Sequence, residues 1–420
     1  MEYISSKNIF LLLRDTLKLI DRRPMNHGSR VGYLLCKMLE CKGGYEQYEL
    51  ADFLMLATLH DIGVYKTENI NNKLNYEFKD ILPHSVYGFL FLRNITPLDD
   101  DKSRMILYHR VPFKQIQGAH YDYFQETTLL TLAEAAEIYH FALGNYKFDY
   151  NMFRRQEGTF YTTQALELLE TCVREYDVFE HLNDDSYQKE IDAILEYMIF
   201  TNEEKKKYME TLMYCIGFKS EAEVVNAVSS LCISQNLAQK LGLGEEDSEK
   251  LYYASLIHDI GMLSISRDII DAARKLTDEE IALMRTHVER EEKILLNRMD
   301  PEVVKIATAH HERCDGSGYP KGLREEEMNT EQFILQVADV VTGLSCDRSY
   351  RKAFEKDQII EILNDEMARN KLNKNITKVF IDSYDEIMAQ AKDEAKKTLE
   401  MYNILGLKYE AVKAKLSGGQ

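Results

Sequence analysis

An ordered set of histidines and carboxylates occurs twice in this chain, and the repeat limits the folds that the chain can adopt. Each member of the first set recurs, in the same order, about 200 residues later. The first set is His60-Asp61, His84, His109 and Glu134, and the second is His258-Asp259, His287, His310 and Asp339. Unrelated histidines would not keep both order and spacing, so the sequence predicts a duplicated unit.

Long amphipathic runs separate these residues, and the 420-residue chain contains only 6 prolines. Apolar residues at a spacing of three and four favour helices, which proline would interrupt. We therefore expect an all-α fold with two tandem helical bundles joined by linker helices. The expected ranges are 1–160 for the first bundle, 161–200 for the linker and 201–412 for the second bundle.

Several helix starts can be predicted from capping residues. Thr96-Pro97 supplies an N-cap followed by proline at the first helical position. Ser220 with Glu223, and Thr277 with Glu280, have the spacing of a capping box. We expect a helix to begin at each of these three places.

The overall charge makes some partners improbable. The chain has 52 basic and 70 acidic residues, a net charge of −18, which repels polymeric nucleic acid and anionic membranes. Its 7 cysteines form no CxxC pair, so neither a zinc knuckle nor a disulfide framework is indicated. With no leader and no apolar run long enough to span a bilayer, we expect a cytoplasmic protein without membrane or nucleic-acid partners.

The second set has the composition of a metal site. His310 and His311 are adjacent and precede a glycine-rich turn, so both rings can face one centre if a helix ends there. Imidazole and carboxylate ligands without thiolate suit iron or manganese, and zinc also fits. Asp259 could bridge two ions, and two ions can hold a phosphodiester and activate water. The alternative to a metal ligand in the His310-His311 pair is a histidine that is simply a polar surface residue. The alternative at His60-Asp61 is an aspartate that caps the helix beside a buried histidine.

These residues resemble the motifs of an HD-GYP domain. The matching segments are His258-Asp-Ile-Gly261, His287, the run from His310-His-Glu-Arg to Gly318-Tyr-Pro320, Ala338-Asp339 and Arg348-Ser-Tyr-Arg351. The resemblance covers residues 203–400 and extends more weakly over 5–150, where the Gly-Tyr-Pro segment is missing. This branch of the HD superfamily is all-helical and hydrolyses cyclic dinucleotides, chiefly cyclic di-GMP and in some members cyclic GMP-AMP.

The resemblance implies a role for particular side chains. His258 and Asp259 would lie at the catalytic centre, and two divalent ions would be bound, iron or manganese first, with zinc, magnesium and nickel open. The implied metal ligands are His258, Asp259, His287, His310, His311 and Asp339, and in the first copy His27, His60, Asp61, His84, His109 and Glu134. The implied substrate contacts are Arg313, Asp315, Tyr319, Lys321, Arg348 and Arg351. The alternative for Arg313, Lys321, Arg348 and Arg351 is that they are ordinary solvated surface charges. The alternative for Tyr319 is that its ring packs within the loop.

Both copies depart from the family pattern. In the second copy Asn226 stands where the family has an early histidine, and Met262 where it has a lysine. In the first copy Arg110 replaces the second histidine of the pair and Val64 the lysine. The departures fit either damage to an ancestral site or adaptation to a different metal or nucleotide. The first copy could therefore be catalytic, regulatory or a scaffold.

From these patterns we expect a metal-dependent phosphodiesterase acting on a cyclic dinucleotide in the second copy. The rival interpretation is a weakly active or inactive module that senses the nucleotide or docks a signalling partner such as a diguanylate cyclase domain. A nucleotidase of the wider HD superfamily is disfavoured, because those proteins lack the Gly-Tyr-Pro segment.

Overall fold

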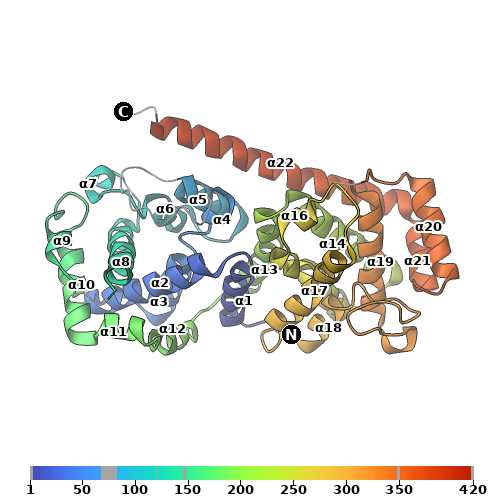
Figure 1. Ribbon diagram of the computed structural model, residues 1–420, viewed down its shortest axis with the longest axis horizontal. Coiled ribbons are helices and arrows are strands. Elements are labelled where there is room, and N and C mark those ends of the chain that lie inside the picture. The colour runs from blue at the N-terminus through green and yellow to red at the C-terminus, as the bar shows by residue number, and fades with distance from the viewer. Residues whose placement is uncertain (1–2, 68–82, 120, 145–147, 348–350, 418–420) are drawn as a thin grey trace. The chain divides into compact units, whose positions relative to one another are not determined.

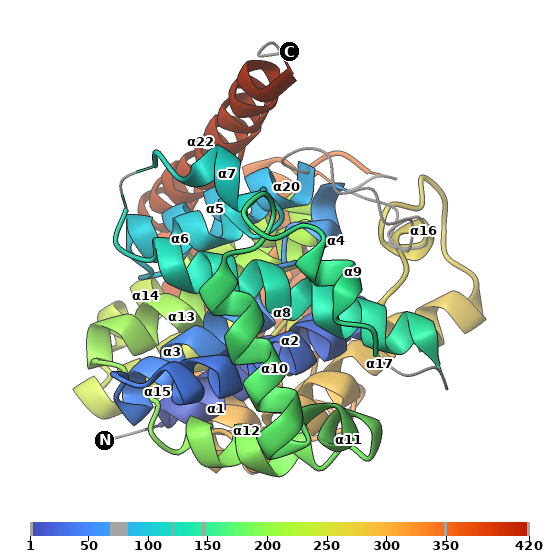
Figure 2. The ribbon, with the colours of Figure 1, turned by 90° about the vertical axis from the view of Figure 1, so that its left-hand side faces the viewer.

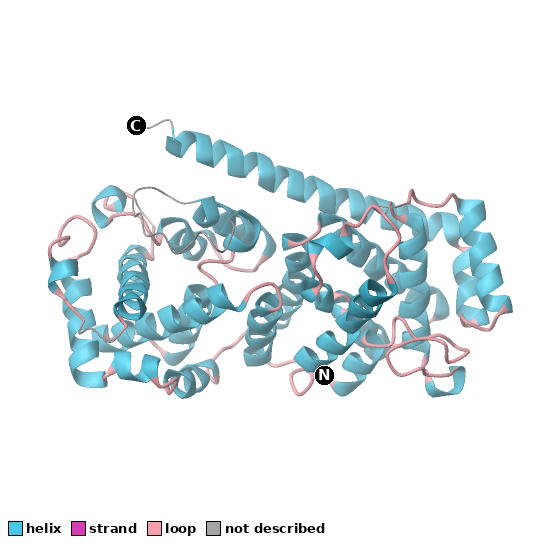
Figure 3. Ribbon diagram, in the orientation of Figure 1, coloured by secondary structure: helices cyan, strands magenta, loops and turns pink. Residues whose placement is uncertain are grey.

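Helices are the dominant regular structure of this protein. The computed structural model describes residues 3–67, 83–119, 121–144, 148–347 and 351–417. In these ranges the only β-type pairings are two isolated bridges, Glu157–Tyr161 and Asp315–Arg324, and no strand is formed (Figure 3). Among the described residues no helix is long and apolar enough to cross a membrane. The all-α prediction is confirmed.

The contacts divide the chain into two compact units (Figure 1). The C-terminal unit consists of residues 1–20 and 206–404, and the N-terminal unit of residues 21–205 and 405–420. Each unit carries one copy of the repeated histidines and carboxylates, so each is described by itself.

The N-terminal unit is built around the long helix α2. Its helices are α2 (Arg22–Lys42), α3 (Gln47–Thr58), α4 (Val64–Thr67), α5 (Pro83–Ile95), α6 (Asp100–Tyr108), α7 (Phe113–Ile116), α8 (Phe124–Leu143), α9 (Asn151–Arg154), α10 (Thr163–Tyr176), α11 (Val178–Asn183) and α12 (Tyr187–Leu195). Helix α2 packs against α3 on one side and α8 on another, and α10 covers α2 and α8 (Figure 2). This packing buries Leu34, Leu54 and Leu132 completely.

The C-terminal unit repeats this plan around α14. Its helices are α1 (Ser6–Lys18), α13 (Asn202–Cys215), α14 (Glu221–Leu241), α15 (Glu245–Ile257), α16 (Arg267–Ile270), α17 (Asp278–Leu295), α18 (Pro301–Ala307), α19 (Thr330–Ser345), α20 (Lys356–Ala368), α21 (Lys374–Asp382) and the first part of α22 (Tyr384–Ser417), with 3₁₀ turns η2 (Ile216–Phe218), η3 (Ile260–Ser264) and η4 (Glu325–Glu327). Helix α14 packs against α15 and α19, as α2 packs against α3 and α8.

The division differs from the predicted ranges at the first helix. Helix α1 belongs to the C-terminal unit, although it was expected in a bundle of residues 1–160. Its Leu12 and Leu13 are fully buried, and the Asn8 amide donates to the Arg298 carbonyl oxygen at 2.9 Å. The apolar periodicity of residues 5–20 correctly indicates a helix, but periodicity does not identify the surface that the helix covers.

The predicted linker of residues 161–200 also differs from the structure. Helices α10, α11 and α12 pack onto α2 and belong to the N-terminal unit. Helix α10 buries Leu166, Leu169 and Cys172, a stripe that needs an apolar partner surface. These helices are therefore part of a core and do not form a separate connection.

Of the three predicted helix starts, those at Ser220 and Thr277 are confirmed, and the one at Thr96-Pro97 is wrong. Helix α6 begins at Asp100 with Asp99 as its N-cap, and the Thr96 hydroxyl instead donates to the Leu92 carbonyl oxygen at 2.6 Å. At α14 the Ser220 hydroxyl accepts from the Glu223 backbone N–H, but the Glu223 carboxylate turns to Asn226 and leaves the box half formed. The capping box of Thr277 with Glu280 is confirmed.

Candidate metal centres

The same local contact orients the clustered histidines in both units. Nδ1 of each of five histidines lies 2.6–2.9 Å from the carbonyl oxygen three residues earlier, which places the ring proton on Nδ1. These histidines are His60, His109, His258, His287 and His310. Because Nδ1 holds the proton, Nε2 keeps a lone pair directed away from the helix end, as a metal ligand requires.

In the C-terminal unit the predicted ligands form two groups of three. His258, Asp259 and Asp339 make one group, and His287, His310 and His311 the other, with ligand atoms within 4.8 Å of one another in each. Asp259 Oδ2 lies 3.5 Å from His258 Nε2, while Oδ1 lies 3.8 Å from His287 Nε2 and 4.0 Å from His310 Nε2. The Asp259 carboxylate thus faces both groups, in the position that a bridging ligand would need.

The electrostatics of this cluster favour a bound cation. Burial lowers the pKa of His287 to about 4, and burial together with His311 holds the pKa of His310 well below its usual value. Burial would raise the pKa of Asp339, but His311, 3.2 Å away, outweighs it and keeps that pKa low. His287 Nε2 and His310 Nε2 lie 3.2 Å apart. With both protons on Nδ1, two lone pairs face each other across this gap, and a cation between them would relieve the repulsion.

In the N-terminal unit Asp61 is shared by two groups. One contains His27, His60, Asp61 and Glu134, and the other Asp61, His84 and His109. The Nε2 atoms of His27, His60 and His109 are buried and have no hydrogen-bond partner in the part of the chain that the structure describes. Buried ring nitrogens without a partner are costly unless a ligand pairs with them, so these residues also fit a metal ion.

Arg110 changes the charge balance of the N-terminal cluster. Its Nε donates to Glu134 Oε1 at 2.6 Å, at the chain position where the other unit has His311. Burial would raise the pKa of Glu134, but Arg110 and His109 outweigh it and hold that pKa well below its usual range. Burial would lower the pKa of His60, yet Asp61 and Glu134 raise it to about 10. Without a metal ion, a guanidinium and a proton on His60 thus supply positive charge in this cluster, and a bound cation would displace that proton.

Of the predicted substrate contacts, Tyr319 lies against the C-terminal cluster. Its ring centroid is 4.7 Å from that of His311, with the planes tilted by 34°, and burial raises its pKa. The guanidinium of Arg285 lies 5.0 Å from the Tyr319 ring centroid on the α17 side. Arg285 was not predicted, although its place two residues before His287 on an exposed helix face could have suggested it.

The other predicted contacts are engaged within the protein. Arg313 donates to the Glu312 carbonyl oxygen, and Asp315 accepts from the Ser317 backbone N–H and hydroxyl. Lys321 Nζ lies 2.8 Å from Glu292 Oε1. Arg351 donates to the Gly343 and Leu344 carbonyl oxygens at the end of α19. Arg348 lies outside the described residues. Their contacts with a substrate stay predictions.

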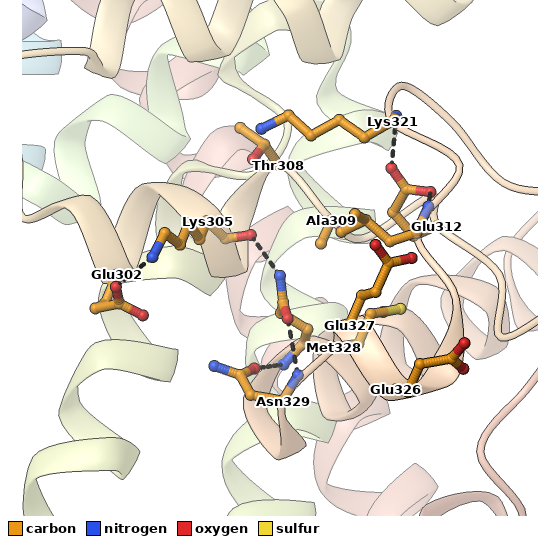
Figure 4. A pocket seen from close by; sticks show the side chains of 12 residues that line it. Glu302, Lys305, Thr308, Ala309, Glu312, Lys321, Glu326, Glu327, Met328 and Asn329 are labelled. Atoms are coloured by element: carbon orange, nitrogen blue, oxygen red, sulfur yellow. Dashed lines mark hydrogen bonds and ion pairs between the residues drawn. The ribbon is translucent and has the colours of Figure 1, made fainter. Parts of the chain in front are cut away.

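A buried glutamate shapes the Gly-Tyr-Pro loop. Glu312 is completely buried, and its two carboxylate oxygens accept from the backbone N–H groups of Lys321, at 2.7 Å, and Leu323, at 2.8 Å. Figure 4 shows the bond to Lys321 at the edge of a cavity of about 500 Å³, whose lining also includes Glu302 and Lys305. No residue of the metal-ligand cluster lines this cavity.

Two buried carboxyl groups near the clusters were missed from the sequence. Glu137 Oε2 lies 2.7 Å from His27 Nδ1, and its spacing of three from Glu134 could have indicated it. Glu291 is completely buried, neither oxygen has a hydrogen-bond partner among the described residues, and burial and Asp259 raise its pKa well above its usual value. Glu291 stands four residues after His287. At the matching place in the other copy, four residues after His84, the sequence has Gly88.

Comparisons with known proteins show what this chain is similar to. The HD-domain family matches residues 210–376. A 3'3'-cGAMP-specific phosphodiesterase 1 from Vibrio cholerae is 26% identical over 416 residues, 90% of this chain and 91% of that protein. A 3'3'-cGAMP-specific phosphodiesterase 2 from the same organism is 29% identical over 46% of this chain, which spans only 37% of that protein. A crystal structure of a cyclic GMP-AMP-specific phosphodiesterase from V. cholerae shares the fold, with a TM-score of 0.55 and 16% identity over 91% of this chain and 98% of that one.

Proposed function

We propose that the protein is a metal-dependent phosphodiesterase that hydrolyses a cyclic dinucleotide in its C-terminal unit, where residues 210–376 match the HD-domain family. The observation that carries the proposal is the position of Asp259, whose carboxylate faces both groups of ligands. The resemblance of residues 203–400 to HD-GYP domains and the names of the relatives in V. cholerae support the substrate class.

The proposed ligands would hold two divalent ions, iron or manganese first. His258, Asp259 and Asp339 would hold one, and His287, His310 and His311 the other, with Asp259 shared. When bound, such ions supply Lewis-acid chemistry: they polarise a phosphodiester and lower the pKa of water from about 15.7 toward about 7. The bonds from Nδ1 of His258, His287 and His310 to backbone carbonyls keep the Nε2 atoms of these three rings oriented before any ion arrives, which reduces the cost of assembling the site.

Residues at the rim would position the dinucleotide. The Tyr319 ring beside His311 offers a flat face against which a base can stack, and Arg285 over that ring offers a cation for a phosphate. Such cations matter in this chain because its net charge of −18 repels a dianionic substrate elsewhere on the surface. Cyclic GMP-AMP and cyclic di-GMP are the two substrates to test first.

The test is turnover of both dinucleotides by Asp259→Asn. The amide removes the shared negative charge while keeping the side-chain volume, so we expect turnover to fall by at least about a hundredfold. Asp61→Asn, the matched change in the other unit, should retain most of the activity. If Asp61→Asn loses turnover and Asp259→Asn keeps it, the chemistry belongs to the N-terminal unit.

We infer further that the N-terminal cluster binds metal. His27, His60, Asp61 and Glu134 offer two imidazoles and two carboxylates within 4.8 Å. Elemental analysis of the reconstituted full chain should find about one equivalent of metal less in a His60→Ala variant than in the wild type. His140→Ala, a change at a histidine outside both clusters, is the control. Equal metal content in His60→Ala and wild type would make the N-terminal histidines structural.

A further inference from the structure

Helices α2 and α14 have matching registers. Each is 21 residues long, and each packs against the helix that ends just before its unit's His-Asp doublet and against the helix that carries the late carboxylate. His27 is the sixth residue of α2, and Asn226 is the sixth residue of α14. His27 Nε2 lies 3.9 Å from Asp61 and 3.8 Å from Glu134, so the sixth position of the helix faces the cluster in the N-terminal unit. The equivalent position in the C-terminal unit holds an amide.

The amide of Asn226 is held in one orientation. Its Nδ2 donates to Glu223 Oε2 at 3.0 Å, and both side chains are buried, with exposures of 5% for Asn226 and 7% for Glu223. A carboxylate only accepts hydrogen bonds, so the NH₂ branch of the amide must face Glu223. The Oδ1 branch then points away from Glu223. The Glu223 backbone N–H meanwhile donates to the Ser220 hydroxyl at the start of α14.

We propose that Asn226 Oδ1 is the fourth ligand beside His258, Asp259 and Asp339, with Glu223 as the residue that positions it, and that this position binds a hard cation. The proposal rests on the two ligand groups of the proposed function. An amide oxygen in place of an imidazole gives the position one nitrogen and three oxygen donors. The neighbouring position has three nitrogen donors, from His287, His310 and His311, and the shared Asp259 oxygen.

Donor type decides which ions these two positions prefer. Carboxylate and carbonyl oxygens suit Mn²⁺ and Mg²⁺, whereas imidazoles suit zinc, iron and nickel. The C-terminal centre is therefore built for two different metals, Mn²⁺ at the position with Asn226 and a softer ion at the three histidines. The N-terminal cluster, with His27 at the matching place, lacks this asymmetry. Asn226 is on this account an adaptation and not damage.

The experiment counts metals in the full-length protein. Metal-free chain is dialysed against a large excess of Mn²⁺ over Zn²⁺, because zinc binds most nitrogen and oxygen sites more tightly, and both metals are measured for the wild type, Asn226→Leu and Asn226→His. Metal at the N-terminal cluster is common to all three and cancels in the differences. We expect Asn226→Leu to lose about one equivalent of Mn²⁺, with Mn²⁺ affinity reduced by at least about tenfold. Asn226→His should keep the site filled but exchange Mn²⁺ for Zn²⁺.

Two controls separate ligation from a structural role. Asn236→Leu removes another amide of α14 that is 9% exposed and bonded through Nδ2 to the Cys232 carbonyl oxygen, and it should keep the wild-type metal content. Glu223→Ala should weaken Mn²⁺ binding, while Glu223→Gln, whose amide oxygen can still accept from Asn226, should restore it. Unchanged Mn²⁺ content and affinity in Asn226→Leu would overturn the proposal, as would a wild type that binds no Mn²⁺ in its C-terminal unit. The readout is metal content, so a failure to hydrolyse cyclic dinucleotides would leave it intact.

Discussion

Glu291 shows how much one buried side chain can depend on its surroundings. Its carboxyl group is completely buried in the C-terminal unit, and burial together with the Asp259 charge raises its pKa. The folded protein therefore binds this proton more tightly than the unfolded chain does. Stability from the proton is fully present below the unfolded pKa, near 4.5, and is lost as the pH rises through the folded pKa.

We expect this linkage to appear when Glu291→Gln is compared with the wild type. The metal-free wild type should lose stability relative to the variant as the pH rises from about 4.5 toward neutrality, because only the wild type can lose the proton. Thermal unfolding of both proteins between pH 4 and 8 measures the difference. Glu289→Gln, a change on the exposed face of the same helix, is the control. A constant difference between Glu291→Gln and the wild type over this range would contradict the expectation.

At the scale of an element, the Gly-Tyr-Pro loop depends on one carboxylate. Both oxygens of Glu312 accept backbone N–H groups, from Lys321 and Leu323. The loop carries Tyr319 to His311, so its conformation places a ring beside the cluster. The N-terminal unit has Arg110 and Val111 after His109, and its sequence has no Gly-Tyr-Pro segment, which is why a substrate site is proposed in only one unit.

Glu312→Gln should therefore disturb both loop and substrate binding. The variant replaces one accepting oxygen by an NH₂ group that meets another donor, and hydrogen bonds to charged groups contribute about 1.5–3 kcal/mol. We expect the free energy of unfolding to fall by about that amount and KM to rise. Glu326→Gln, an exposed change near the same cavity, should alter neither quantity. An unchanged KM in Glu312→Gln would show that the loop does not contact substrate.

At the scale of the whole molecule, the first helix of the chain packs into the C-terminal unit, most of which is formed by residues 206–404. Helix α1 packs on α17 and η3, and Leu13 is fully buried in the C-terminal unit. Removing a buried leucine side chain costs about 2–5 kcal/mol. We expect Leu13→Ala to destabilise the C-terminal unit.

Hydrogen exchange can locate that effect. Leu13→Ala should speed amide exchange in α17 and leave α2 and α3 little changed. Leu35→Ala, which empties a buried position of α2, should do the reverse. Faster exchange in α2 and not in α17 after Leu13→Ala would place the first helix with residues 21–205, as the sequence ranges had suggested.

Local patterns in the sequence were sufficient for the helical class, and they led to the prediction of a duplication and of the types of metal ligand. Apolar spacing and capping act over about four residues, so the box at Thr277 and the helix ends before His60 and His258 could be read directly. The order of the histidines indicated a metal centre before any contact was known. Their convergence in two groups around Asp259 agrees with that expectation.

Only the tertiary structure decided which surfaces meet. Helix α1 joins residues about 290 positions away through contacts such as Asn8 with Arg298, and no local pattern specifies such a partner. The burial of Glu291 beside Asp259 likewise arises from segments that approach one another in space. Burial removes the water that would otherwise satisfy these polar groups, so their charges and hydrogen bonds depend on neighbours brought together by packing.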